Sequence, residues 1–309
     1  MNNKKVKTAE EYKCGYLGPE GTFSEMAALK YGKLCDKIIP YKTIREVVEN
    51  VRKGEIDRGI IPLENSLEGS VKISLDLLFD KSGLSIIDEV VIPIEHYLLA
   101  PPGVTMTDIT DIYSHPQVLG QAGDFVYEHF PRAELHYTES SASAVDRVLD
   151  NGHKAMIGSR RISDLYPLEI LAENVEGDLS NHTRFVVVAF KEKAEVMSDN
   201  HPDRAYKTSI ICAPDVNRPG VLYQILGEFA SRNIDLTRIE SRPTKEKLGE
   251  YLFYIDLAGH LSQEKLSTAL GEVEKICGLF KVLGSYPRAN MNNEGRDDKD
   301  ELTIQKRAE

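Results

Sequence analysis

The stretch from Asn181 to Phe190 places a hydroxyl group and a permanent cation at the entrance to an apolar run. Thr183 can donate or accept a hydrogen bond, and Arg184 can pair with a carboxylate through two parallel N–H bonds. The run from Val186 to Phe190 is mostly β-branched and lacks polar alternation, which predicts a strand buried on both faces. Polar groups at the mouth of such a strand either mark its surface end or line a cavity.

Four other segments place hydroxyl, amide or imidazole groups where a predicted strand passes into a helix. They are GYLGPEGTFSE (15–25), PLENSLEGSV (62–71), SHPQVLGQ (114–121) and TESSASAV (138–145). In an open α/β sheet, ligand groups gather at the carboxyl ends of the strands. Each segment also has a plain structural explanation, because Thr, Ser and Asn are favoured at helix starts. The residue types alone therefore leave ligand binding and helix capping open.

Neutral hydrogen-bond donors outnumber charged catalytic groups at these junctions. The sequence contains no Ser-His-Asp order, no HExxH motif and no Cys/His cluster at metal-ligand spacing. The glycines of segment 15–25 follow neither the Walker A nor the GxGxxG spacing, which makes a nucleotide a poor expectation. Helix starts and neutral donors suit an anionic ligand. We therefore expect a binding site for a small anionic metabolite.

Composition limits the class of protein. A chain of 309 residues with 41% hydrophobic and 28% charged residues indicates a globular protein, more consistent with two domains than with one. Its net charge of −11 argues against nucleic acid as the main partner. The start has no secretory signal, and no window approaches the ~20 apolar residues that span a bilayer. The four cysteines (Cys14, Cys35, Cys212 and Cys277) lie far apart, so we expect neither a disulfide framework nor a zinc site, and predict a cytoplasmic location.

The first 190 residues alternate predicted strands and helices, as in an α/β domain. Strands are expected at 14–17, 59–63, 86–94, 112–114, 155–157 and 185–190, and helices at 22–31, 43–53, 117–129 and 141–150.

A second pattern follows the polar segment 191–205, which contains Pro202 and predicts a linker. Its strands and helices occur in the order βαββαβ, the ferredoxin-like arrangement. The expected elements are strands at 208–213, 234–240, 251–257 and 280–286, with helices at 220–232 and 262–276. Residues 288–309 have little apolar surface to bury and predict a disordered tail.

Taken together, GPEGTFSE, PLENSLEGSV, SHPQVLGQ, TESSASA and NHTRF, in this order and followed by ESRP, closely resemble the prephenate dehydratase family. The second unit resembles the ACT regulatory domain fused to it. The resemblance covers residues 14–287. It implies a catalytic domain at 14–190 with two α/β lobes, similar to type II periplasmic binding proteins, and an ACT domain at 206–287. No chorismate mutase domain fits before Cys14, so the monofunctional form is expected.

The resemblance implies decarboxylating dehydration of prephenate to phenylpyruvate in phenylalanine synthesis, without metal or organic cofactor. Thr183 is the residue expected to help the ring hydroxyl leave. Adjacent strand side chains point to opposite faces, so Arg184 either binds substrate or supports the site from the other face. The residues implied to bind substrate are Thr22, Ser24, Glu64, Asn65, Ser66, His115, Gln117, Ser140, Ser141, Asn181, Arg184 and Phe185.

The ACT resemblance implies phenylalanine binding at a subunit interface, hence a homodimer or homotetramer with feedback inhibition. The implied effector residues lie in two segments: Gly220, Val221, Leu222 and Tyr223, then Glu240, Ser241, Arg242 and Pro243. Asn217, Asn233 and Asp235 depart from the family's usual residues, which leaves the strength of feedback open, and a pure dimerisation domain is the alternative.

Two other functions stay open at this point. Arogenate dehydratase acts on a substrate in which an amino group replaces the keto group, and no residue separates the two activities. A non-catalytic sensor of small anions is the rival from another class, although the intact TRF triplet (183–185) argues against it.

Overall fold

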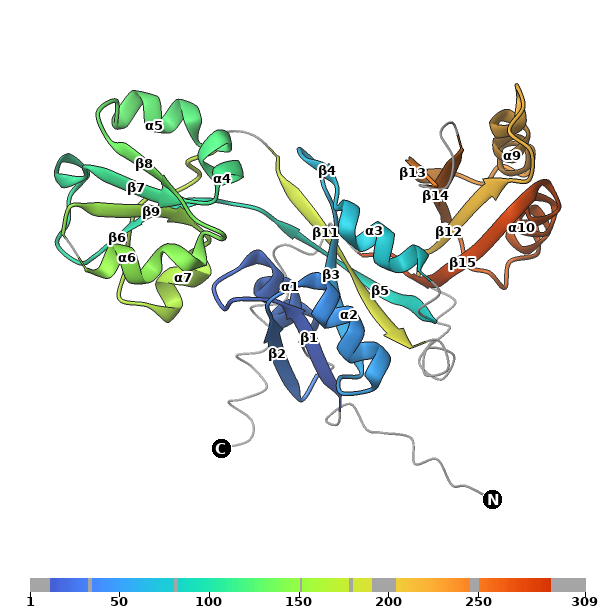
Figure 1. The fold of residues 1–309 in the computed structure, drawn as a ribbon, viewed down its shortest axis with the longest axis horizontal. Coiled ribbons are helices and arrows are strands. Elements are labelled where there is room, and N and C mark those ends of the chain that lie inside the picture. The colour runs from blue at the N-terminus through green and yellow to red at the C-terminus, as the bar shows by residue number, and fades with distance from the viewer. Residues whose placement is uncertain are drawn as a thin grey trace, which may run out of the picture. The chain divides into compact units, whose positions relative to one another are not determined.

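The computed structural model describes residues 12–32, 35–80, 83–150, 152–177, 180–190, 204–244 and 250–289. The chain divides into two compact units, Met1–Ser198 and Asp199–Glu309, each of which is described by itself (Figure 1). Most of the predicted linker 191–205 and nearly all of the predicted tail 288–309 lie outside the described residues.

The first lobe of the first unit is built on a six-stranded sheet in the order β2-β1-β3-β11-β5, with β4 paired to β3. β1 runs parallel to β2 and β3, whereas β11 runs antiparallel to β3 and β5. Seven consecutive β11 residues are buried, which confirms the strand predicted from the apolar run. The elements are β1 (Lys13–Leu17), α1 (Phe23–Tyr31), β2 (Lys37–Tyr41), α2 (Ile44–Lys53), β3 (Arg58–Asn65), β4 (Gly69–Ser70), α3 (Lys72–Phe79), β5 (Leu84–Pro93) and β11 (His182–Phe190).

The second lobe has a five-stranded sheet in the order β10-β6-β9-β7-β8. The helix predicted over 117–129 is wrong as a single helix, because it is interrupted at Ala122. Gly120 and Gly123 flank the break, and glycine weakens a helix interior. The elements are β6 (Tyr97–Ala100), β7 (Asp111–Ser114), α4 (Pro116–Gln121), α5 (Gly123–His129), β8 (Glu134–Tyr137), α6 (Val145–Leu149), β9 (Lys154–Gly158), α7 (Arg160–Leu165) and β10 (Glu169–Ala172), with 3-10 turns at Met106–Asp108 and Ala142–Ala144.

The chain passes between the two sheets twice, at residues 94–96 and again between β10 and β11. The passages are joined by backbone hydrogen bonds, from Ile94 N to Asn181 O at 2.8 Å and from Val175 N to His96 O at 3.1 Å. Each sheet has its own buried apolar cluster. The predicted two-lobed α/β domain is confirmed.

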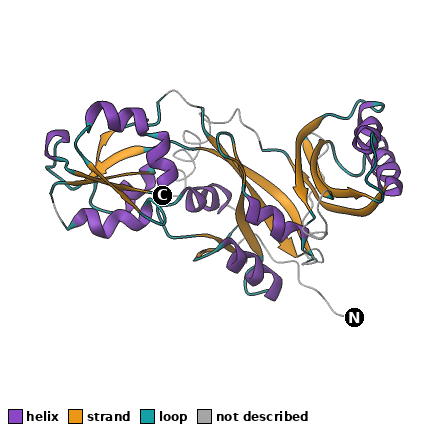
Figure 2. Cartoon of the chain, turned by 45° about the horizontal axis from the view of Figure 1, so that its top comes forward, coloured by secondary structure: helices purple, strands orange, loops and turns teal. Residues whose placement is uncertain are grey.

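The second unit has the predicted βαββαβ order on a four-stranded sheet, β13-β14-β12-β15. Its two helices lie on one face of the sheet (Figure 2), where Phe229, Ile255 and Leu266 belong to one buried cluster. The elements are β12 (Tyr206–Pro214), α9 (Val221–Ala230), β13 (Leu236–Pro243), β14 (Tyr251–Ala258), α10 (Glu264–Ile276) and β15 (Cys277–Pro287).

Contrary to the expectation of no disulfide framework, Cys14 and Cys35 form a disulfide. Cys14 is in β1 and Cys35 leads into β2, so the pairing of these strands brings their Cα atoms to 6.0 Å across 21 positions of sequence. Cys212 and Cys277 are free thiols. Within the described ranges, no helix is both long and apolar enough to cross a membrane.

Candidate active site

Thr183 lies directly opposite Asn65 in the antiparallel pair of β11 and β3. Opposed residues project from the same face of a sheet, and Asn65 Nδ2 donates a 2.8 Å hydrogen bond to Thr183 Oγ1. Asn65 Oδ1 accepts from the backbone N–H groups of Leu67 and Glu68, each at 3.0 Å. The amide of Asn65 is thereby fixed, and its donor occupies an acceptor site of the Thr183 hydroxyl. The hydroxyl hydrogen of Thr183 can point toward a ligand.

A chain of side-chain amides extends from this pair into the second lobe. Asn65 Nδ2 also donates to Asn181 Oδ1 at 2.6 Å, and Asn181 Nδ2 donates to Gln121 Oε1 at 3.4 Å. Gln121 Nε2 then donates to Glu68 Oε1 at 3.3 Å. Because Gln121 ends α4 while Glu68 belongs to the β3–β4 turn, the amides join the two lobes beside Thr183.

Arg184 projects from the other face of β11, where it pairs with carboxylates. Its Nε donates to Glu89 Oε2 at 2.6 Å, and its Nη1 lies 3.6 Å from Glu64 Oε1. The side chains of Arg184 and Glu89 are 6% and 1% exposed. A buried cation held by two carboxylates supports the alternative in which Arg184 stabilises the shape of the site.

Three of the expected substrate residues, Thr22, Ser24 and Ser140, line one pocket of about 880 Å³. Thr22 caps α1, since its Oγ1 accepts from Glu25 N at 3.3 Å, and its hydroxyl donates to Pro19 O at 2.9 Å. The pocket lining includes neither Thr183 nor Asn65. Its residues are Leu17, Gly18, Pro19, Glu20, Thr22, Ser24, Pro40, Tyr41, Lys42, Glu139, Ser140, Ser143 and Tyr166.

The two lobes also meet at the start of α1. Ser159 Oγ donates to Gly21 O at 2.6 Å, and Arg161 Nη2 lies 3.3 Å from Glu25 Oε1. Glu25 Oε2 accepts the Gly21 N–H at 2.7 Å, so one buried carboxylate closes the turn before α1 and binds the second lobe. Its hydrogen bond with Glu25 raises the pKa of Arg161, which keeps this guanidinium charged.

The other expected residues make protein contacts that limit their freedom. Ser66 Oγ donates to Ser180 O at 3.2 Å and accepts from His182 N at 2.9 Å. His115 Nδ1 caps α4 by accepting from Gln117 N at 3.3 Å.

Ser141 is half-buried in the second lobe, and Phe185 is buried in the first. Ser141 Oγ is 3.0 Å from Ser114 Oγ, whose hydroxyl donates to Ile157 O. Phe185 is 2% exposed and packs in the core of the first lobe.

In the second unit, the first predicted effector segment lines a pocket of about 580 Å³ at the start of α9. Gly220 precedes α9 with a φ of 84°, a left-handed conformation that favours glycine. Arg218, Leu226 and Phe253 also line the pocket, whereas the second predicted segment, Glu240–Pro243, does not.

Comparison with known proteins matches residues 14–193 to the model of the family "Prephenate dehydratase" and residues 216–275 to the ACT domain. A prephenate dehydratase of Methanocaldococcus jannaschii is 38% identical over 277 residues, which cover 88% of this chain and 97% of the relative. The chain belongs to the prephenate dehydratase family.

Solved structures agree with this family assignment. A prephenate dehydratase from Arthrobacter aurescens in complex with L-Phe matches with a TM-score of 0.80 and 34% identity, covering 96% of this chain and 97% of that one. A structure described as GqqA, a novel type of quorum quenching acylase, also reaches a TM-score of 0.80, at 26% identity over 91% of this chain and all of that one. Because one fold serves both activities, function must be argued from the site.

Two residues of the prephenate dehydratase domain, His96 and Gln121, join the amide chain but were not predicted. Gln121 ends the segment SHPQVLGQ (114–121), which carries candidate ligand groups, but the sequence does not indicate its hydrogen bonds to the other amides. His96 is 1% exposed, its Nε2 lies 3.1 Å from Gln121 Oε1, and burial lowers its pKa to about 4. The sequence shows it only as a lone histidine after a strand. Lys42 in the pocket lining was missed as well.

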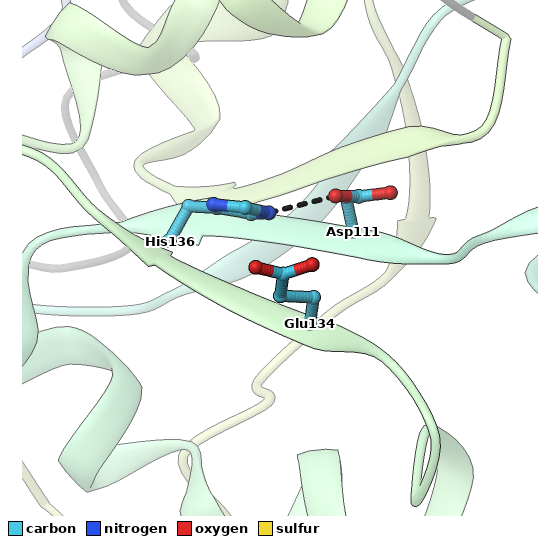
Figure 3. A group of neighbouring side chains, drawn as sticks. All are labelled: Asp111, Glu134 and His136. Atoms are coloured by element: carbon cyan, nitrogen blue, oxygen red, sulfur yellow. Dashed lines mark hydrogen bonds and ion pairs between the residues drawn. The ribbon is translucent and has the colours of Figure 1, made fainter.

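One group of the described residues could hold a metal ion: Asp111, Glu134 and His136 (Figure 3). They share a face of the parallel pair β7–β8, and their ligand atoms lie within 4.8 Å of one another. His136 Nε2 lies 2.7 Å from Asp111 Oδ1, so two of the three already form a hydrogen bond. Asp111 begins β7 whereas Ser114 ends it. The group is therefore at the edge of the sheet opposite the predicted ligand positions.

Proposed function

We propose that this chain catalyses the decarboxylating dehydration of prephenate to phenylpyruvate and that Thr183 assists the departure of the ring hydroxyl. The observation that carries the proposal is the 2.8 Å hydrogen bond from Asn65 to Thr183 Oγ1. In the reaction, the bond between the ring and its carboxylate breaks to release CO2. The electron pair enters the ring, and the ring C–O bond breaks with uptake of one proton to release water.

Thr183 supports this step as a hydrogen-bond donor. An unperturbed threonine hydroxyl is a very weak acid, so it stabilises the departing hydroxide rather than losing its own proton. With Asn65 bound to its oxygen, the hydroxyl hydrogen is directed to another acceptor. A donor of this kind typically contributes ~3 kcal/mol to the barrier.

Prephenate carries two carboxylates, which the pocket at the start of α1 is suited to hold. The first N–H groups of this helix and the hydroxyl of Ser24 are donors to an anion. Lys42 supplies a positive charge among the lining residues. These local groups oppose the effect of the net charge of −11, which disfavours a dianion at long range.

The pocket at the start of α9 supports binding of phenylalanine as a feedback inhibitor. Helix-start N–H groups near Val221 are donors for the amino acid's carboxylate, and Asp215 offers a partner for its ammonium group. Leu226 and Phe253 provide apolar surface for its ring.

A homodimer or homotetramer is part of this proposal. Val216, Tyr223, Ile239 and Tyr251 of the second unit are 45–80% exposed, which is unusual for large apolar side chains unless a partner covers them. A second subunit would bring its segment Glu240–Pro243 to the effector. A cytoplasmic location likewise remains a prediction.

The decisive experiment compares prephenate and arogenate side by side and repeats the assay with phenylalanine while the oligomer size is measured. Formation of phenylpyruvate, with the higher kcat/KM on prephenate, is the expected result. A higher kcat/KM on arogenate would identify arogenate as the substrate. Turnover of neither compound would favour the non-catalytic sensor of small anions. Unchanged activity at saturating phenylalanine would contradict feedback inhibition. The measured oligomer size would then test the proposed homodimer or homotetramer separately.

A further inference from the structure

His96 lies in the first passage between the two lobes and is held from both sides. Its backbone N–H donates to Glu176 Oε2 at 2.9 Å, and its carbonyl accepts from Val175 N in the second passage. Its ring and that of Phe23 of the first lobe form a T-shaped pair with a centroid distance of 5.4 Å. On the second-lobe side, Nε2 contacts Gln121 Oε1. The imidazole therefore lies where any change in lobe separation alters its contacts.

The hydrogen bonds around Gln121 define which atom of His96 carries the proton. Gln121 Oε1 faces the donor Asn181 Nδ2, while Gln121 Nε2 faces the carboxylate of Glu68. An oxygen in this position requires a donor from His96, so Nε2 holds the hydrogen. His96 Nδ1 is buried and has no hydrogen-bond partner within the described part of the chain.

The environment keeps this imidazole neutral. Burial lowers its pKa to about 4. Glu176 binds the backbone of His96, and burial raises the pKa of that carboxyl. The neighbouring Glu95 accepts from the Tyr97 hydroxyl at 2.8 Å, and Glu68 contacts Gln121 rather than the ring. At neutral pH, His96 is consequently a single tautomer with one donor.

We propose that His96 is a positioning residue for Thr183. It acts through the side chains of Gln121 and Asn181, which connect its single donor to the Asn65 amide that the Leu67 and Glu68 backbone anchors. Asn65 Nδ2 donates to both Asn181 and Thr183, so a shift of Asn181 after loss of the His96 donor changes the hydrogen bond that leaves the threonine hydroxyl free to donate to the substrate. The inference rests on the proposed dehydratase activity.

A buried nitrogen without a hydrogen-bond partner is costly, and an apolar side chain at this position would avoid that cost. The imidazole instead makes one directed contact, and that contact reaches the amide chain beside Thr183. The chain is complete only when α4 of the second lobe lies against the β3–β4 turn of the first. Lobe arrangement and the hydrogen bonding of Thr183 are therefore coupled through the amide chain that His96 joins at Gln121.

The kinetic test compares His96→Leu, which cannot donate, with His96→Gln, whose amide can donate from a similar position. His96→Leu is expected to lower kcat roughly 10- to 100-fold while KM changes by less than about threefold. His96→Gln should recover kcat to within about fivefold of wild type. Tyr97→Phe is the matched control, since it removes the neighbouring hydroxyl, which donates to Glu95 and not to the amide chain, and should leave both constants unchanged. Equal kcat values for His96→Leu and wild type would overturn the proposal, and so would a failure of His96→Gln to recover activity.

A measurement that needs no turnover separates this inference from the proposed function. The imidazole nitrogens and side-chain amides are observed by NMR in the 15N-labelled protein. A single Nε2–H tautomer that does not titrate between pH 5.5 and 8 is expected, together with shifted amide signals of Asn65 and Asn181 in His96→Leu but not in Tyr97→Phe. Unshifted amide signals would overturn the proposal. If the wild-type protein forms no phenylpyruvate, the proposed function fails, and these signals still decide whether His96 orients the amide chain.

Discussion

Asn65 and Thr183 stand opposite each other on neighbouring strands, and the amide of Asn65 donates to the hydroxyl oxygen of Thr183 at 2.8 Å. The direction of this bond matters more than its length. A hydroxyl that accepts from a fixed amide must turn its hydrogen elsewhere, and the proposed reaction needs a donor for a departing hydroxyl group.

Removing the hydroxyl by Thr183→Ala should lower kcat roughly 100-fold, the loss expected for one donor worth ~3 kcal/mol in the transition state. Thr183→Ser keeps the donor and should retain most of the activity. Steady-state kinetics with prephenate checks both variants. An alanine variant within a few-fold of wild type would assign the leaving-group donor to another residue.

Replacing Asn65 by a side chain that only accepts should also impair catalysis, because it reverses the direction of the hydrogen bond with Thr183. In Asn65→Asp the carboxylate can only accept, so the Thr183 hydroxyl would donate to it and be lost to the substrate. We expect kcat to fall at least tenfold with the fold retained by circular dichroism. Asn50→Asp is the matched control, because the Asn50 side chain lies on α2 and donates to the Glu46 backbone carbonyl. A similar loss in both variants would mean that added charge, not the position of the amide, causes the effect.

His96 gives the stability of the first unit a defined pH dependence. Its pKa is about 4 in the folded chain against an ordinary value of 6.5. Between these values the unfolded chain binds more protons, so the free energy of unfolding rises with pH in this window and is constant above it. We expect a loss of about 2 kcal/mol from pH 7 to pH 5 that is absent in His96→Leu. Urea denaturation of both proteins at the two pH values measures the difference, and equal losses would place the pH dependence on other groups.

The ion pair between Glu25 and Arg161 should contribute to stability because the carboxylate is buried. Glu25 is 7% exposed and Arg161 29% exposed at their side chains. Arg161→Gln would leave the carboxylate with the Gly21 N–H as its one hydrogen-bond partner among the described residues, at an expected cost of about 1–2 kcal/mol in the free energy of unfolding. Arg160→Gln, one position earlier on α7, is the control for loss of surface charge. Equal stabilities of the two variants would show that the pair contributes nothing.

The disulfide between Cys14 and Cys35 can be tested separately. Closing a loop of about 20 residues stabilises a fold by roughly 3 kcal/mol in the chain-entropy estimate. A reducing agent should therefore lower the melting temperature of the wild-type protein and leave that of Cys14→Ser unchanged. Titration of thiols in the denatured, unreduced protein should detect two cysteines, and detection of four would exclude the bond.

The sequence predicts the elements that carry strong patterns. The apolar run of β11 and the βαββαβ order of the second unit are confirmed, and the ordered motifs place Thr183 and Asn65 in one site proposal. Pairing between distant strands leaves no local signal. For that reason the disulfide was missed, and so was the position of β11 between β3 and β5.

The sequence also did not predict the roles of residues whose hydrogen-bond partners lie in the other lobe. His96 and Gln121 are 25 positions apart and belong to no shared local pattern. Ser66 shows the converse case, since its hydroxyl looked available for substrate and is bonded to the backbone of residues 180 and 182. Spacing identifies candidate groups, but only the folded structure shows which hydrogen bonds these groups already make within the protein.

The order of the strands has a consequence for how the chain is made. β11 lies between β3 and the edge strand β5 in the first-lobe sheet, yet it follows every strand of the second lobe in sequence. On the ribosome, the second lobe can pack as soon as β10 emerges, whereas the first lobe must wait with an open gap between β3 and β5. The last strand to be synthesised in the unit both closes that gap and delivers Thr183. A nascent chain interrupted before His182 would therefore present two unpaired strand edges to chaperones and aggregation partners.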